Sequence, residues 1–237
     1  MNTLQAIWQL KMPTPRVLSN TQGFTLIELI GVLAVIGVLA ALIVPRVFDI
    51  IASSKIDALA SALKTYETAV TKYYTDMGTV LPLNTAGNPQ LESSGNSATA
   101  HSLPARLTLS RFDPLVLNSN LWPRFMGPYL ERFNTNAPPA LGTKMYMPVK
   151  SAVAYGTSVT GTDMGWDLRG DDGNSDLPSN ANVAYIYVTG VSEEDFLEID
   201  AIIDRDVGAS DSEKEVRGRA KWNTLNNGTL KLYLAHQ

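Results

Sequence analysis

An apolar segment at residues 24–45 contains a single charged side chain, Glu28, and this combination limits the chain more than any other feature. As a helix, the segment spans roughly 30 Å, about the thickness of the hydrocarbon core of a membrane. A carboxylate embedded in a membrane helix costs roughly 2.5–3.5 kcal/mol on insertion scales, so it indicates a function. The segment therefore predicts a membrane helix whose acid serves something other than anchoring.

The charges divide unevenly around this helix. The chain has 19 basic and 23 acidic residues, and its first 23 residues carry only Lys11 and Arg16, which leaves a net charge of -6 for the rest. Because basic flanks stay in the cytoplasm, we expect a single-pass membrane protein with its N-terminus cytoplasmic and its acidic body exported.

Several kinds of chemistry are excluded by composition. The chain has no cysteine, which excludes thiolate zinc sites, redox motifs and cysteine nucleophiles. The histidines are His101 and His236, and no Ser/His/Asp arrangement or phosphate-cradling loop accompanies them. We therefore expect that the protein is not an enzyme.

The residues around Glu28 resemble a known processing signal. A secretory signal has a short apolar core followed by its cut site, whereas here the candidate site, Gly23, precedes a longer apolar run. The stretch Gly-Phe-Thr-Leu-Ile-Glu at residues 23–28 is similar to the prepilin-peptidase motif of type IV pilins and type II secretion pseudopilins. An ordinary membrane anchor is the alternative interpretation.

The resemblance implies a specific maturation. Prepilin peptidase would cut after Gly23 and methylate the new N-terminal residue, Phe24. Inside a filament the Phe24 amine and the Glu28 carboxylate would each be costly alone and would satisfy each other between neighbouring subunits. The implied partners are identical and related pilin subunits, prepilin peptidase and an inner-membrane assembly platform.

Two helix-weakening residues also match the family. Gly37 and Pro45 fall where these proteins often have a glycine and a proline. One interpretation is a segment that unwinds when the subunit packs into a filament. The other is that membrane helices simply tolerate both residues.

Beyond Pro45 the pattern predicts a second, amphipathic half of the same helix. An apolar stripe recurs every three to four residues, and the helix should end near Met77 and Gly78. The members of the stripe are Ile56, Leu59, Leu63, Tyr66, Val70 and Tyr73.

The C-terminal half predicts an antiparallel sheet. Strand signals lie at residues 144–149, 183–189, 216–222 and 229–235, with turn residues at 226–228 between the last two. Ser192 and Asp195 form a capping-box-like start for a helix running to about Asp204, which should bury Phe196, Ile199, Ile202 and Ile203. Short helical pieces are expected at 115–116 and 122–130, and Phe112, Trp122, Phe125 and Tyr129 are expected in the core or an interface.

The fold class is therefore α+β, a long N-terminal helix packed on an antiparallel sheet of about four strands, as in pilins. We expect a leader at 1–23, a membrane and filament-core helix at 24–46 and an amphipathic continuation at 47–77. A variable loop region at 78–142 and a sheet with a short helix at 143–237 follow.

An acid-rich loop is the candidate metal site. Asp172, Asn174 and Asp176 alternate like the first half of a calcium loop, although the glutamate that completes such a loop is missing. Major pseudopilins, which the N-terminus resembles, carry a calcium loop near their C-terminal sheet. The alternative is a solvated turn. A second oxygen cluster at residues 204–208 is more typical of a helix terminus.

Alternating charges on the 216–222 strand suggest a basic face. Its residues would be Arg217, Arg219, Lys221 and Lys231, and it could contact the acidic helix at 193–206 of a neighbouring subunit. Four charges in an acidic body make no convincing nucleic-acid site.

The sequence thus predicts a structural subunit of a type IV filament, with preference for a secretion pseudopilin that drives protein export from the periplasm. A pilin of a surface fibre for adhesion, motility or DNA uptake is the alternative. A membrane-anchored protein that binds a ligand or metal is the alternative of another class.

Overall fold

A computed structural model describes residues 23–91, 101–117, 122–137, 141–151, 165–169, 175–178, 180–205, 217–224 and 227–237. The predicted calcium residues Asp172 and Asn174 lie outside these ranges. The chain divides into two compact units, residues 1–48 and 49–237, and each is described by itself.

The described part of the first unit is helical from Leu26 onward and exposed throughout. It contains the start of α1 (Leu26–Met77), a helix of 52 residues that continues through Pro45 without ending. An 18-residue window of α1 reaches a mean hydropathy of 2.8 with none of its residues buried, so α1 is long and apolar enough to cross a membrane. Side chains of this kind need lipid or another polypeptide around them.

In the second unit, α1 buries the predicted stripe. The stripe residues are all buried, and Ala69 joins them. The helix ends at Met77, as the sequence predicts, because Gly78 adopts a φ of +71° and donates its N–H to the Tyr74 carbonyl at 2.7 Å.

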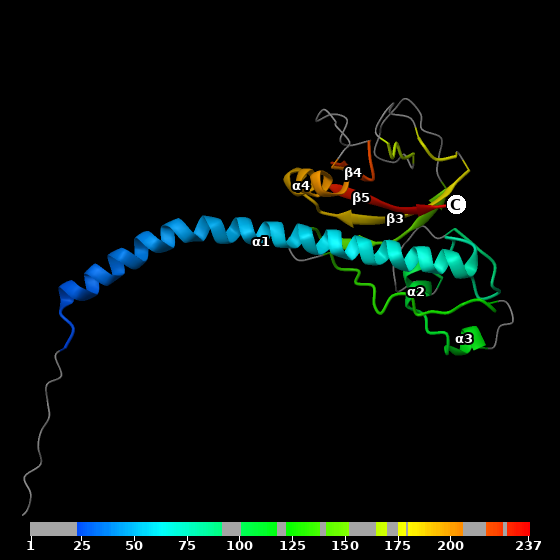
Figure 1. The fold of residues 1–237 in the computed structure, drawn as a ribbon, viewed down its shortest axis with the longest axis horizontal. Coiled ribbons are helices and arrows are strands. Elements are labelled where there is room, and N and C mark those ends of the chain that lie inside the picture. The colour runs from blue at the N-terminus through cyan, green and yellow to red at the C-terminus, as the bar shows by residue number, and fades with distance from the viewer. Residues whose placement is uncertain are drawn as a thin grey trace, which may run out of the picture. The chain divides into compact units, whose positions relative to one another are not determined.

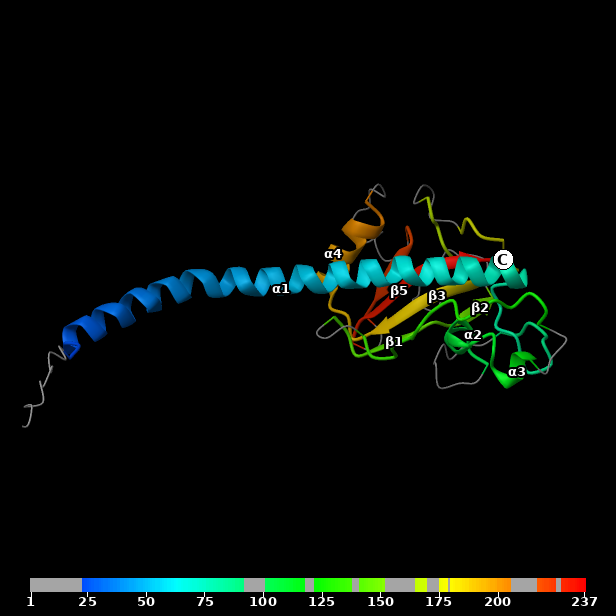
Figure 2. The same ribbon diagram turned by 60° about the horizontal axis from the view of Figure 1, so that its bottom comes forward.

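The sheet has five antiparallel strands. They are β1 (Lys144–Tyr146), β2 (Val149–Ser151), β3 (Asn182–Thr189), β4 (Ala220–Asn223) and β5 (Thr229–His236). Their order is β1-β3-β5-β4, and β2 pairs with β3 beyond β1. Figures 1 and 2 show α1 running along one face of this sheet.

The sequence predicted one strand at 144–149 where the structure has two. Met147 and Pro148 separate β1 from β2, yet both strands pair with β3. Pro148 has no N–H to give to the ladder, so the pairing breaks there. The predicted C-terminal hairpin is confirmed, with Asn223 opposite Thr229. The strand predicted at 216–222 is shorter, because residues 217–219 form an isolated bridge and bends before β4 begins at Ala220.

The two faces of β3 serve two cores. Ala184, Ile186 and Val188 join the main core with α1, whereas Val183 and Tyr185 point to a smaller cluster around Trp166 and Leu177. This is the period-two alternation of a strand buried on both faces. The loop that carries Trp166 therefore covers the face of the sheet opposite α1.

The described part of this unit also contains the short helices α2 (Leu103–Thr108), α3 (Pro114–Leu117) and α4 (Glu193–Ile203). The Ser192 cap is confirmed, since its hydroxyl accepts the Asp195 N–H at 3.1 Å. The expected helix at 122–130 is wrong, since these residues form turns and irregular backbone that pack Trp122 and Phe125 into the core.

One expected core position, Ile202, is wrong, and Phe112, expected in the core or an interface, does not lie in the core. Phe112 is 68% exposed and Ile202 is 39% exposed. Phe112 lies in a turn before α3, and Ile202 lies at the edge of the α4 face that buries Phe196 and Ile199. Ile202 follows the buried Ile199 by three residues, so spacing alone predicted that it would be buried. Its side chain is nevertheless exposed in the structure.

Candidate processing and assembly site

Helix α1 begins with a reciprocal pair of hydrogen bonds between Thr25 and Glu28. The Glu28 carboxylate accepts the Thr25 backbone N–H and the Thr25 hydroxyl, both at 2.8 Å, while the Glu28 N–H reaches the Thr25 hydroxyl oxygen at 3.3 Å. This is a capping box, in which the side chains at the cap and at the third helical position satisfy each other's backbone N–H groups. Glu28, the charged residue of the apolar segment, therefore helps to cap the N-terminus of α1.

The position of the carboxylate also suits the field of the helix. Glu28 lies in the first turn, where the N–H groups without intrahelical partners carry partial positive charge. Both bonds from Thr25 end on Oε2 of Glu28, and a carboxylate has further acceptor sites on its other oxygen. Glu28 can therefore cap its own helix and still accept a hydrogen bond from another group.

The predicted cut site precedes this cap. Residues 23–25 are not helical, and the Gly23–Phe24 peptide bond lies two residues before the first residue of α1. Both residues are exposed, Phe24 at 87%. A peptidase binds an extended backbone. The Gly23–Phe24 bond is exposed and non-helical, as such binding requires, whereas a bond inside α1 is held in the helix.

Gly37 and Pro45 lie on the exposed part of α1. A Cβ at Gly37 would meet nothing within 4 Å, so no contact with the described residues requires glycine at this position. Pro45 is accommodated within the helix. Their proposed role in unwinding stays a prediction.

The one described residue of the expected calcium set is held by an arginine. Asp176 Oδ2 accepts the Arg169 N–H at 2.9 Å, and Oδ1 accepts Nε at 2.8 Å and also Nη2. Arg169 holds the pKa of Asp176 below its usual range. Among the residues that the structure describes, no group of three or more His, Asp or Glu side chains could hold a metal.

The expected basic strand face is wrong as an exposed surface. Lys221 and Lys231 are each only 7% exposed. Lys221 donates to the Gly165 carbonyl and lies 4.8 Å from the centre of the Trp166 ring. Arg219 pairs with Glu67 of α1 in the same chain. These charges hold the subunit together instead of facing a neighbour.

Sequence reasoning missed two residues that act in these arrangements. Thr25 was not recognised as the cap, although Thr followed three residues later by Glu is the sequence signature of a capping box. Glu67 was not singled out, and no local signal could have revealed its pairing with Arg219, about 150 positions away in sequence.

Comparison with known proteins agrees with the geometry at the N-terminus. Residues 18–44 match the family model described as the prokaryotic N-terminal methylation motif. A fimbrial protein, EcpC of Eikenella corrodens, is 42% identical over 57 residues, which cover 24% of this chain and 37% of that protein. No solved structure matches. This chain therefore carries the prokaryotic N-terminal methylation motif at its N-terminus, and it spans little more than a third of the length of the fimbrial relative it matches.

Proposed function

We propose that the chain is the precursor of a structural subunit of a type IV filament, cut after Gly23, methylated on Phe24 and polymerised through α1. The observation that carries the proposal is the Thr25–Glu28 capping box at the start of an exposed apolar helix, directly after an exposed Gly23–Phe24 bond. The methylation motif at residues 18–44 supports it.

The geometry suggests how one carboxylate serves two stages. Before the cut, Glu28 closes the first turn of α1 through Thr25. After the cut, the Phe24 amine is a cation on an apolar helix, and a carboxylate on a neighbour is its natural partner. Pairing one subunit's amine with the next subunit's Glu28 would fix the register of α1 helices packed through their apolar surfaces.

Mass spectrometry of the chain isolated from its own bacterium tests the maturation directly. We expect a mature N-terminus at Phe24 with the mass of one added methyl group. A Gly23→Leu variant should retain the leader and remain in the inner membrane. An unmodified N-terminus upstream of Gly23 would overturn the proposal and leave an ordinary anchored protein.

Two versions of the filament have separate support. The acid-rich loop at residues 172–176 favours a type II secretion pseudopilin, because it resembles half of a calcium loop. The similarity to a fimbrial protein favours a surface fibre. Deletion of the gene separates them: periplasmic retention of exported proteins indicates secretion, and loss of surface fibres with normal export indicates a pilus.

A further inference from the structure

Helix α4 presents a second face that no part of the described second unit covers. Phe196 and Ile199 are buried against the sheet, but Leu197 and Ile202 are 36% and 39% exposed. The exposed stripe Glu194, Leu197, Glu198, Ala201 and Ile202 follows the three-to-four spacing of one helix face. The face is acidic and apolar at once.

The acidic residues are only partly explained by the helix itself. Glu193, Glu194 and Asp195 lie in the first turn of α4, where carboxylates stabilise a helix N-terminus. Stabilisation of the helix N-terminus does not explain Glu198, which lies in the second turn. It also does not explain why the aliphatic side chains of Leu197 and Ile202 are exposed to solvent. A partner surface that is basic and apolar would match both properties.

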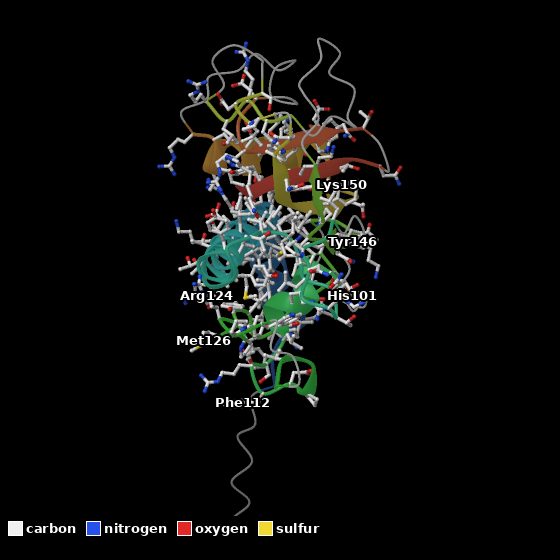
Figure 3. All side chains as sticks on the ribbon, turned by 90° about the vertical axis from the view of Figure 1, so that its right-hand side faces the viewer. His101, Phe112, Arg124, Met126, Tyr146 and Lys150 are labelled. Carbon is white, nitrogen blue, oxygen red and sulfur yellow. The ribbon has the colours of Figure 1, made fainter. Side chains whose placement is uncertain are left out.

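The same unit carries such a surface. Arg111, Phe112, Arg124 and Met126 are exposed, Phe112 at 68% and Met126 at 58%. Their two segments are joined, because the Arg111 N–H donates to the Gly127 carbonyl at 3.0 Å. Figure 3 faces this end of the molecule and labels Arg124, Met126 and Phe112.

A hollow beside this surface gives it shape. A pocket of about 390 Å³ lies between the last turns of α1 and the 126–129 segment, lined by Lys72, Thr75, Asp76, Met126, Pro128 and Tyr129. Tyr129 donates to the Asp76 carboxylate at 2.7 Å, so this acid is already engaged. Lys72 adds a further positive charge at the rim.

The two surfaces lie at opposite ends of the second unit. α4 is at one end and α3, which follows Phe112, is at the other, in both Figure 1 and Figure 2. Complementary surfaces at opposite ends cannot meet within one chain, and between chains they form a head-to-tail contact that can repeat from subunit to subunit, as a filament requires.

We propose that the exposed α4 face docks onto the Arg111–Phe112–Arg124–Met126 surface of a second copy of this chain, as a repeating contact between subunit bodies. The inference rests on the proposed filament function and assigns it a contact outside α1. Stable interfaces bring about 20–30 residues from each side, far more than these surfaces offer, so the contact should form in the assembled filament and not as a dimer in solution.

Disulfide cross-linking of the full chain in its own bacterium tests the contact, because the natural chain has no cysteine. The double variant Leu197→Cys with Met126→Cys should give a ladder of dimers, trimers and larger products on oxidation of isolated filaments. Each single variant should stay monomeric. The control pair is Leu197→Cys with Thr143→Cys; Thr143 is exposed next to the end of β3, on the α4 side of the unit, and should give no ladder.

Each outcome has a distinct meaning. Filaments that form normally but give no ladder overturn the docking inference and leave the proposed function intact. Dimers from a single cysteine variant indicate a symmetric contact and also overturn it. Absence of filaments from the unaltered chain would overturn the filament function and the inference together.

Charge reversal adds a second readout. Glu198→Arg in the cross-linking background should reduce the cross-linked fraction about twofold to fivefold, the range expected for one exposed ion pair. Adding Arg124→Glu should restore it. Equal cross-linking in all three chains would show that charge does not direct the contact and would overturn the pairing of these two surfaces.

Discussion

Asp204, the residue that ends α4, accepts the backbone N–H of Ala220, the first residue of β4, at 2.7 Å. The same Oδ2 atom accepts the Arg219 N–H at 2.7 Å. Asp204 is only 8% exposed, so its carboxylate supplies the partner for two N–H groups at the start of a strand. One side chain thus links α4 to the C-terminal hairpin.

This arrangement predicts a pH dependence of stability. Burial raises the pKa of Asp204 above its ordinary 3.8, outweighing the lowering effect of the two amide bonds. The folded state then holds the proton more tightly than the unfolded state, so the contribution of Asp204 to stability is greatest below pH 3.8 and is lost as pH rises through the raised pKa. Asp204→Asn keeps an oxygen acceptor without titrating.

The measurement is denaturant unfolding of the full chain in detergent across that pH window, followed by tryptophan fluorescence. Asp204→Asn should gain stability relative to the unaltered chain as pH rises, because the other titrating groups are common to both. Asp204→Ala leaves two buried N–H groups without a partner and should lose about 2–4 kcal/mol. A pH-independent difference between Asn and Asp would contradict the argument.

Gly218 is predicted to be irreplaceable for two separate reasons. Its φ is +81°, and a Cβ there would overlap Asp204 Oδ2 and lie 2.5 Å from its Cγ. Gly78 has a similar φ of +71°, but a Cβ there meets nothing within 4 Å. Gly78→Ala should therefore cost about 1–2 kcal/mol, the left-handed penalty alone.

Gly218→Ala should cost more, by roughly a further 1–3 kcal/mol, because it also displaces the carboxylate from the two N–H groups it serves. The pair of variants separates backbone strain from steric overlap. Equal losses of unfolding free energy at the two glycines would show that the Asp204 contact contributes nothing.

Local patterns predicted most of the architecture. The stripe from Ile56 to Tyr73, the helix end at Met77 and the Ser192 cap each depend on neighbours within a few residues, so sequence spacing was enough. The break between β1 and β2 and the burial of Lys221 depend on what packs against them from elsewhere in the chain. No spacing rule encodes such contacts.

The candidate site divides in the same way. Gly23, Phe24 and Glu28 were predicted from their motif, and Thr25 could have been found from the same stretch. The contact of Arg219 with Glu67 was mistaken for a contact with a neighbour, because alternation along a strand reports which side a residue faces and not what covers that side.

The Arg219–Glu67 ion pair carries a third prediction. It joins the segment before β4 to α1, with side chains 36% and 20% exposed, and burial lowers the pKa of Arg219. Because Arg219 pairs with Glu67 of its own chain, Arg219→Glu should destabilise the subunit itself. We expect a loss of about 1–3 kcal/mol, between the values of surface and buried pairs.

A double-mutant cycle measures this coupling. Arg219→Gln and Glu67→Gln should each destabilise the full chain in detergent, and the double variant should lose less than the sum of the two. Strictly additive losses would mean that the two side chains do not interact. A stable Arg219→Glu subunit that fails to assemble would show that Arg219 acts in contacts between subunits.

The last prediction separates the two roles of Glu28. Glu28→Gln keeps an oxygen that can accept the Thr25 N–H, since Gln also serves in capping boxes, but it removes the charge. Glu28→Leu removes both. Each variant should insert in the membrane and be cut after Gly23, and each should give at least about tenfold fewer filaments, because an unpaired Phe24 amine in an apolar filament core costs roughly 3–5 kcal/mol.

Thr25→Ser, which keeps the hydroxyl, is the matched control and should assemble normally. Filaments are counted by electron microscopy, and processing is followed by the mass of the membrane-bound chain. Wild-type filament yield from Glu28→Gln with failure of Glu28→Leu would assign the carboxylate to the cap alone and remove the charge pairing from the assembly mechanism.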